Sequence, residues 1–321
     1  AHVFVDLREV RENEWGQYRQ LTAYLSGRGV PSIDEALQEL FLQPLHQPFR
    51  MLVSAPAFRW MMDARITEPG AEVDEDLLDQ VESKTRDLLQ AVRHTAGVEK
   101  PDEKLEDIAE SVRDKLEIIL SLPARFATID HDEATDYEEV TTYVLEPLEG
   151  DDPALWGTLL GWLFIHELGR VIDEEEYRAI SRSWIDEWLL GKVTASALRD
   201  MGLSEEAAWR AVATVKLLLG YQGEFGEEDT YAFLNEILSK GPVQAFLSVN
   251  RHRGILWFNK ESFEKLIWWL MLLETVEIAT DEDEEEVFEE IASRYVFVEE
   301  LLAAEAESDY QIGKLLDAAK A

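Results

Sequence analysis

Helix periodicity runs through almost the whole chain, and it limits the possible folds more than any other feature. From residue 11 onward, apolar residues recur at the three- and four-residue spacings of amphipathic helices. Residues 155–165 and 266–273 go further, because apolar side chains surround the helix axis. A helix without a polar face is buried on all sides, in a core or an interface. The sequence therefore predicts an all-α, multi-helix bundle centred on these two segments.

Polar residues and glycines mark where several helices begin and end. Short polar side chains accept hydrogen bonds from the first helical turn, and glycine adopts the left-handed conformation that often follows the last turn. On these grounds we expect N-caps at Asp74, Asp102, Asp152, Ser204 and Asn259. We expect C-caps at Gly29, Gly97, Gly202 and Gly241.

One acidic stretch interrupts the pattern and suggests how the chain is divided. Residues 123–151 contain Pro123, Pro147 and Gly150 and show little periodicity. We expect a linker there, containing a strand or a short helix at 140–145. The linker would separate a helical lobe at 11–122 from a second lobe at 152–321.

The first residues follow a different period. Val3, Val5 and Leu7 alternate with other side chains, as in a β-strand. A lone strand has nothing to pair with, so residues 1–10 are either a short edge strand or extended arm, or the remnant of a preceding β domain. The missing initiator Met favours the remnant.

Charge and composition exclude several classes of partner. The chain carries 30 Lys and Arg against 67 Asp and Glu, a net charge of −37. Such a surface repels nucleic-acid phosphates and anionic lipids, so neither nucleic acid nor a membrane is an expected partner. The apolar run at 266–273 is far shorter than the roughly 20 residues that span a bilayer. We expect a soluble, cytoplasmic protein.

His166 and Glu167 begin the sequence HELGR, which resembles the zinc-binding helix H-E-x-x-H. Arg170 stands where the second histidine ligand would be, and a guanidinium does not bind metal. Cysteine is absent from the chain, so no thiolate can replace that ligand. We therefore expect no metal and no cofactor, and a polar patch in which Glu167 pairs with Arg170 or Arg178.

Two acidic clusters also invite a metal-site interpretation. Residues 130–133 place a histidine among carboxylates, and residues 281–286 are almost wholly acidic. The first is interpreted as a solvated loop. The second lacks the glycine and the alternating ligands of a calcium loop, so it is interpreted as an acidic first helical turn.

Tryptophan provides the remaining candidate binding residues. Most of the ten Trp lie in apolar helical context, where core packing is expected, namely Trp60, Trp156, Trp162, Trp184, Trp188 and Trp268. Trp257 follows a rare basic patch, and Arg251, Arg253 and Trp257 together could form a small recognition site. Trp269 is expected either to pack on a second helical layer or to meet a neighbouring domain. No catalytic residue is assigned.

Several segments together resemble the C-terminal part of very large bacterial α-amylase-family proteins, glycoside hydrolase family 13. These segments are residues 2–10, 27–50, 183–192, 256–270 and 310–316. The resemblance implies a helical region that follows a catalytic barrel and a β domain. The barrel motifs D-x-x-x-N-H and G-x-R-x-D do not occur in this chain, so no catalytic residue is implied.

Three hypotheses about function follow. The first is a non-catalytic helical domain of a family 13 enzyme, with a packing, substrate-holding or interaction role. Its partners would be the catalytic and β domains of the same polypeptide, together with α-glucan. The alternative is a free-standing acidic helical interaction module, and the third is a helical glycosidase in its own right.

Overall fold

Helices make up nearly all of the structure, a computed structural model that describes residues 11–26, 33–127, 137–221, 223, 225–281 and 284–320. The predicted all-α fold is confirmed. The α-helices are α2 (Trp15–Ser26), α3 (Ile33–Leu52), α4 (Ala55–Asp63), α5 (Glu75–Ala96), α6 (Asp102–Phe126), α7 (Tyr137–Leu145), α8 (Pro153–His166), α9 (Tyr177–Glu187), α10 (Leu190–Asp200), α11 (Glu205–Leu218), α12 (Thr230–Ser239), α13 (Gly241–Phe246), α14 (Lys260–Asp281), α15 (Glu284–Glu307) and α16 (Ile312–Ala318). Two 3₁₀ segments, η1 (Glu146–Leu148) and η2 (Glu167–Val171), and one hairpin of β1 (Asn250–His252) and β2 (Ile255–Trp257) complete the elements.

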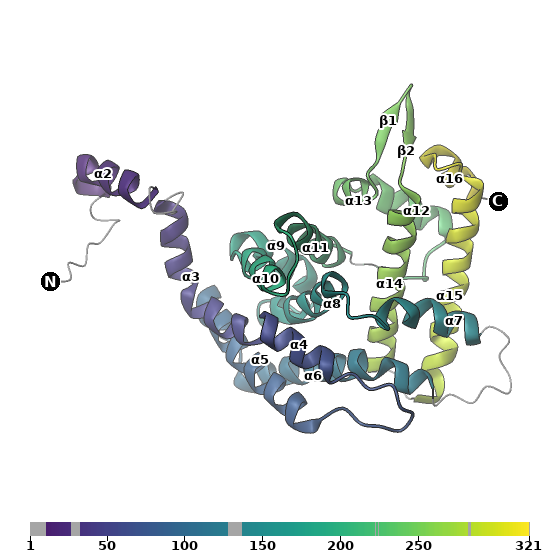
Figure 1. Ribbon diagram of the computed structural model, residues 1–321, viewed down its shortest axis with the longest axis horizontal. Coiled ribbons are helices and arrows are strands. Elements are labelled where there is room, and N and C mark those ends of the chain that lie inside the picture. The colour runs from purple at the N-terminus through teal and green to yellow at the C-terminus, as the bar shows by residue number, and fades with distance from the viewer. Residues whose placement is uncertain are drawn as a thin grey trace.

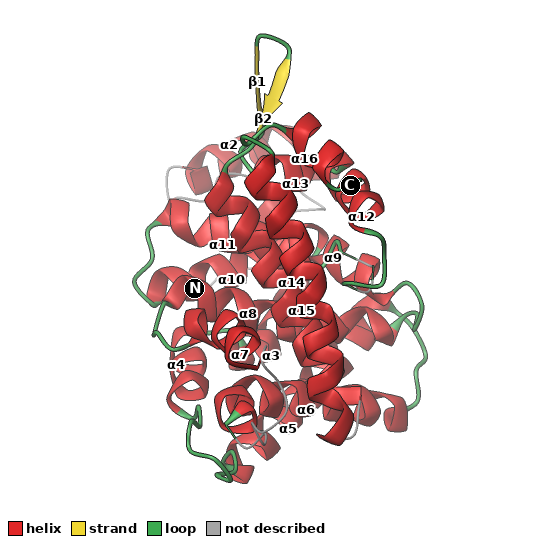
Figure 2. Cartoon of the chain, turned by 90° about the vertical axis from the view of Figure 1, so that its right-hand side faces the viewer, coloured by secondary structure: helices red, strands yellow, loops and turns green. Residues whose placement is uncertain are grey.

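The helices form a broad body with two projections (Figure 1). Helices α5 and α6 lie side by side at one edge, and α8 to α11 form a central group. Helices α14 and α15 form a long pair that α7 crosses, and the hairpin, α12, α13 and α16 gather at one end of this pair (Figure 2). At the other side of Figure 1, α3 leaves the body and α2 stands apart from it.

The two apolar segments occupy the core, as the sequence predicts. Every residue of α8 from Leu155 to His166 is buried, and so is every residue of α14 from Leu266 to Leu273. Gly161 brings α8 close to two neighbouring helices, because a Cβ there would lie 3.3 Å from Thr194 of α10 and 3.5 Å from Val215 of α11. The two apolar helices are therefore enclosed on all sides by other helices.

The expected linker at 123–151 is in part a packed element of the body. Helix α6 continues to Phe126, and residues 137–148 form α7 and η1. Val140, Val144 and Leu148 are buried and belong to the same apolar cluster as residues of both expected lobes. Of the two forms expected at 140–145, the structure has the helix. Three predictions lie outside the described residues. They concern the strand at 1–10, the acidic loop at 130–133 and the acidic side chains of 281–286.

Several helix ends follow their sequence signals. The side chains of Asp74, Asp152, Ser204 and Asn259 accept hydrogen bonds from the first turns of α5, α8, α11 and α14. Gly97 adopts a left-handed conformation after α5. The prediction for Asp102 is wrong, because Pro101 is the N-cap and Asp102 is already helical. Gly241 is also not a C-cap, since it is the first residue of α13.

Two predicted breaks are misplaced near the N-terminus. Helix periodicity predicts separate segments at 32–42 and 47–65, the second interrupted by Pro48 and Pro56, yet α3 runs continuously through Pro44 and Pro48 and ends at Leu52. A continuous buried stripe, including Leu45 and Phe49, offsets the hydrogen bonds that the prolines remove. The actual break precedes α4, where Pro56 occupies the first turn, a position that proline tolerates.

Helix periodicity in the sequence predicts one helix at 174–200, whereas the structure has two, α9 and α10. Helix α9 ends at Glu187, and Leu189 has a left-handed backbone with a φ of 52°. Side chains of α3 satisfy the carbonyl groups that this break frees. Gln38 donates to the Glu187 carbonyl at 2.9 Å, and Nε2 of His46 donates to the Trp188 carbonyl at 2.8 Å.

Candidate functional site

The β1–β2 hairpin carries the three residues that were expected to form a recognition site. Its two-residue turn consists of Arg253 and Gly254, whose φ angles of 51° and 84° match the twisted turn that closes tight hairpins. Arg251 and Arg253 are exposed, whereas Trp257 is half-buried. The hairpin projects from the end of the body (Figure 1), so both arginines face solvent.

The hairpin does not bring Arg251 and Trp257 to one face. Arg251 pairs with Leu256 across the strands, and Trp257 pairs with Asn250. Directly opposed residues share a face and successive residues alternate between faces. Arg251 and Trp257 therefore point to opposite sides, and the expected three-residue site is not assembled. The sequence signal that could have shown this is the turn-forming Arg253-Gly254 pair.

Trp269 is not a surface residue. Its side chain is only 1% exposed, and its ring lies 4.8 Å from that of Trp268. Trp268 is buried beside it, and its Nε1 donates to the Val144 carbonyl of α7. Of the two expectations for Trp269, packing against further helices is the one the structure has. The proposed binding role of Trp269 is corrected, because the helices around α14 leave this side chain no accessible face.

The sequence HELGR forms part of a buried ionic cluster. Helix α8 ends at His166, and η2 begins at Glu167, so the zinc-helix geometry is absent as well as its second ligand. Gly169 permits the turn, because a Cβ there would overlap the Tyr177 carbonyl of α9. The Gly169 N–H donates to Ser181, whose hydroxyl donates in turn to the His166 carbonyl, each at 2.8 Å.

Lys115 of α6 lies at the centre of this cluster. Its ammonium is 2.6 Å from Glu167 and 2.7 Å from Glu277 of α14. Arg170 approaches the other oxygen of Glu167 at 3.0 Å, which confirms the predicted Glu167–Arg170 pair. Nδ1 of His166 donates to Glu167 at 3.0 Å, since a carboxylate can only accept. The cluster joins α6, η2 and α14.

Burial and charge determine the protonation of these groups. Burial lowers the pKa of His166 more than its carboxylate neighbours raise it, so the imidazole is neutral at pH 7. Burial alone would raise the pKa of Glu167, but the hydrogen bond from His166 and the Lys115 ammonium hold that pKa well below its ordinary value. Burial disfavours the Lys115 ammonium, yet the two carboxylates raise its pKa overall. The Lys115 ammonium and the Glu167 carboxylate are therefore both charged, and each is balanced by a neighbour of opposite charge.

The cluster has the properties of a structural ion-pair network. Lys115 and Glu167 are both almost wholly buried. Within the described residues, no group of three metal-binding side chains is assembled. The sequence analysis identified Glu167 and Arg170 but missed Lys115 and Glu277. Both stand at ordinary positions of long amphipathic helices, and only the packing of α6 on α14 brings them together.

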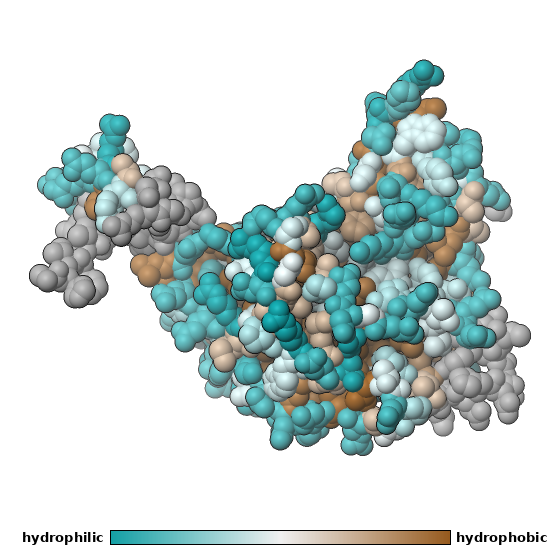
Figure 3. Space-filling view, viewed as in Figure 1, coloured by the Kyte–Doolittle hydropathy of each residue, from teal (hydrophilic) through white to brown (hydrophobic). Residues whose placement is uncertain are grey.

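The N-terminal arm, defined here as α2 and residues 38–41 of α3, exposes large apolar side chains. Trp15 and Phe41 are each 61% exposed, Leu40 is 64% exposed and Tyr24 is 57% exposed. Figure 3 shows apolar surface where α3 leaves the body and a broad concave face between the arm and the hairpin end. The arm therefore exposes two pairs of large apolar side chains, Trp15 and Tyr24 on α2 and Leu40 and Phe41 on α3.

In comparisons with known proteins, no family model, no curated protein and no solved structure matches this chain. Among the described helices, none is both long enough and apolar enough to cross a membrane.

Proposed function

We propose that this chain is a non-catalytic helical domain of a family 13 glycoside hydrolase that acts on α-glucans. We further propose that its N-terminal arm docks against the catalytic and β domains that precede it in the same polypeptide. The family part of the proposal rests on the sequence resemblance. The observation that carries the docking part is the exposure of Trp15 and Tyr24 on α2 and of Leu40 and Phe41 on α3.

The arm lacks the burial that would stabilise it. Helix α2 has 12 residues, and an isolated helix of this length is marginal in water. Burying a Leu or Phe side chain contributes about 1.5–3 kcal/mol. A partner that covered Leu40 and Phe41 would therefore supply stabilisation that the arm does not obtain from the body.

The position of the arm in the sequence indicates which partner is nearest. The arm follows residues 2–7 directly, and their strand pattern is the one expected of a preceding β domain. A domain attached there would be held within reach of the arm, and attachment raises its effective concentration at that surface. The partner proposed for the arm is therefore the preceding domains of the same polypeptide rather than a separate protein.

The segments that carry the family resemblance meet in pairs. Residues 38–46 of α3 hold the break at 187–189 through the two carbonyl contacts described above. Trp257 forms an isolated bridge with Gln311, and the Phe258 N–H donates to the Tyr310 carbonyl at 3.0 Å. These contacts hold junctions between helices, which is a packing role compatible with the proposed accessory domain.

The test uses the whole polypeptide that contains this chain. In the Leu40→Ser/Phe41→Ser double variant, trypsin should cleave the arm after Arg11 and Arg19 at least about tenfold faster than in the wild type, because docking protects the arm. Val296→Ser is the matched control, since Val296 is also exposed but lies on α15. The control should be cleaved like the wild type.

Two results would contradict the proposal in different ways. Equal cleavage of the wild-type arm in the whole polypeptide and in the isolated chain would remove the docking role. A reading frame without the barrel motifs before residue 1 would remove the family 13 assignment and leave the free-standing interaction module.

The isolated chain should release no reducing sugar from starch. Release that one Asp or Glu substitution abolished would support the helical glycosidase instead.

A further inference from the structure

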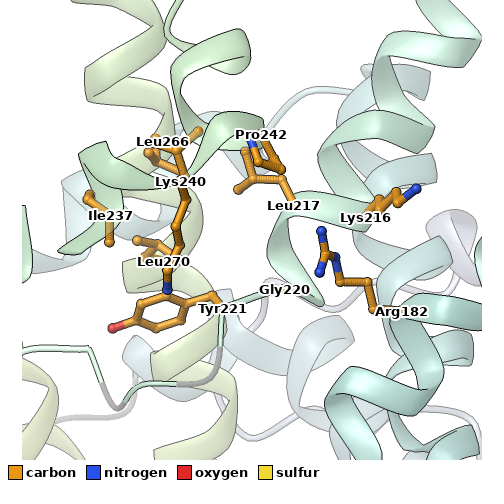
Figure 4. Close-up of a pocket in the computed structure, with 11 residues that line it drawn as sticks. Arg182, Lys216, Leu217, Gly220, Tyr221, Ile237, Lys240, Pro242, Leu266 and Leu270 are labelled. Carbon is orange, nitrogen blue, oxygen red and sulfur yellow. The ribbon is translucent and has the colours of Figure 1, made fainter.

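A cavity of about 430 Å³ lies between the central helices and the α12–α14 group. Arg182 of α9 and Lys216 of α11 approach it from one side, and Lys240, at the end of α12, approaches it from the other (Figure 4). Ile237, Leu266 and Leu270 form an apolar wall. The cavity thus combines positive charge with apolar surface.

The charge of the cavity is opposite to that of the molecule. Among the described residues that line it, three are cationic and none is acidic, in a chain of net charge −37. Two of the cations already have partners, because Lys216 pairs with Asp186 and Lys240 pairs with Glu236 at 2.6 Å. In Figure 4 the Lys216 ammonium points away from the cavity.

Arg182 differs from both lysines. Its guanidinium points into the space between the two groups of helices (Figure 4). Its Nε is buried and has no hydrogen-bond partner among the described residues. A buried donor without an acceptor is costly, so an acceptor that entered the cavity would complete the arrangement.

Gly220 provides the room that Arg182 occupies. A Cβ at position 220 would lie 3.1 Å from Nε and 3.2 Å from Cδ of Arg182. At these separations an alanine would shift the arginine side chain by a few tenths of an ångström. The glycine therefore leaves room for the position that the guanidinium takes.

We propose that this cavity binds a small organic anion with one carboxylate head and an apolar tail. The planar guanidinium of Arg182 matches a carboxylate through two parallel hydrogen bonds. The wall of Ile237, Leu266 and Leu270 takes the tail, since ligand cavities combine apolar walls with a few polar anchors. This site is separate from the arm and does not depend on the proposed function.

The experiment titrates the purified chain with octanoate by calorimetry. Acetate supplies the head without the tail, and octylamine supplies the same tail with a cationic head. We expect saturable octanoate binding, and at least about tenfold weaker binding of the other two compounds, because each lacks one of the two interactions. Tight binding of octylamine, or no binding of octanoate, would overturn the proposal.

Two variants test the assigned residues. Arg182→Gln should weaken octanoate binding at least about tenfold by removing the guanidinium, and Gly220→Ala should weaken it less, by shifting the guanidinium. Arg182 makes no ion pair with a described residue, so Arg182→Gln should remain folded. Arg210→Gln is the control, because Arg210 is exposed on α11 and pairs with Glu206. Unchanged binding by Arg182→Gln would refute the site.

Discussion

The N-terminal arm and helix α14 both carry large apolar side chains, but these side chains are exposed in the arm and buried in α14. In α14, eight consecutive apolar residues are enclosed, and Trp269 is 1% exposed. In the arm, Trp15 remains 61% exposed although it stacks on Tyr18 at 5.3 Å. The difference shows that composition alone does not determine burial. The burial of an apolar side chain depends on how many neighbouring helices pack against its segment.

The body is stabilised by contacts within the chain, whereas the arm is proposed to be stabilised by contacts with a partner. The body has one continuous apolar cluster and a buried ionic network that joins three of its elements. Substitutions in these parts should reduce the stability of the isolated chain. Substitutions of the exposed apolar side chains of the arm should leave that stability unchanged and act only where a partner is present.

The largest expected effect compares two tryptophans. Trp269→Ala and Trp15→Ala remove the same atoms, one from the core and one from the arm. Truncating the buried tryptophan should lower the free energy of unfolding by about 3–5 kcal/mol. Truncating the exposed one should change it by less than about 0.5 kcal/mol. Urea unfolding of the isolated chain measures both, and similar losses would mean that the arm is part of the folded body.

The next effect concerns the buried ionic network. Lys115→Met leaves Glu167 and Glu277 without their shared ammonium, and breaking a buried pair in this way costs about 3–5 kcal/mol. Lys104→Met is the control, because Lys104 pairs with Asp107 at the surface, where solvent screens the pair and its contribution to stability is small. Thermal and urea unfolding compare the variants. A loss in Lys115→Met no larger than in the control would show that the cluster does not stabilise the body.

The sequence predicted the parts of this comparison to different extents. The enclosed helices were predictable, because runs such as 266–273 have no polar face. The break at 188–189 was not, since neither Trp188 nor Leu189 is a turn residue and the contacts that hold it come from α3. Lys115 and Glu277 are far apart in sequence, so nothing local indicated their shared site. The opposite orientation of Arg251 and Trp257 was not predictable from their closeness in sequence, because it depends on the strand register.

A smaller effect should appear on acidification. His166 faces Lys115, Glu167 and Glu277, and burial lowers its pKa from the ordinary value of 6.5. Below about pH 6.5 the unfolded chain binds a proton that the folded chain does not, so stability falls as the pH falls. One such group contributes up to about 1.4 kcal/mol per pH unit. Urea unfolding between pH 7 and pH 5 should show this slope, reduced in His166→Asn, and an unchanged slope in that variant would contradict the assignment.

The central claim is that the arm is exposed in the isolated chain and covered in the whole polypeptide. The chain contains no cysteine, so Phe41→Cys introduces a single reactive thiol, and Val296→Cys provides the same on α15. The measurement is the rate of thiol modification in the isolated chain and in the whole polypeptide. The account predicts at least about tenfold slower modification of Phe41→Cys in the whole polypeptide, because cover limits access to the thiolate, and an unchanged rate for Val296→Cys. Equal rates for Phe41→Cys in both contexts would contradict it.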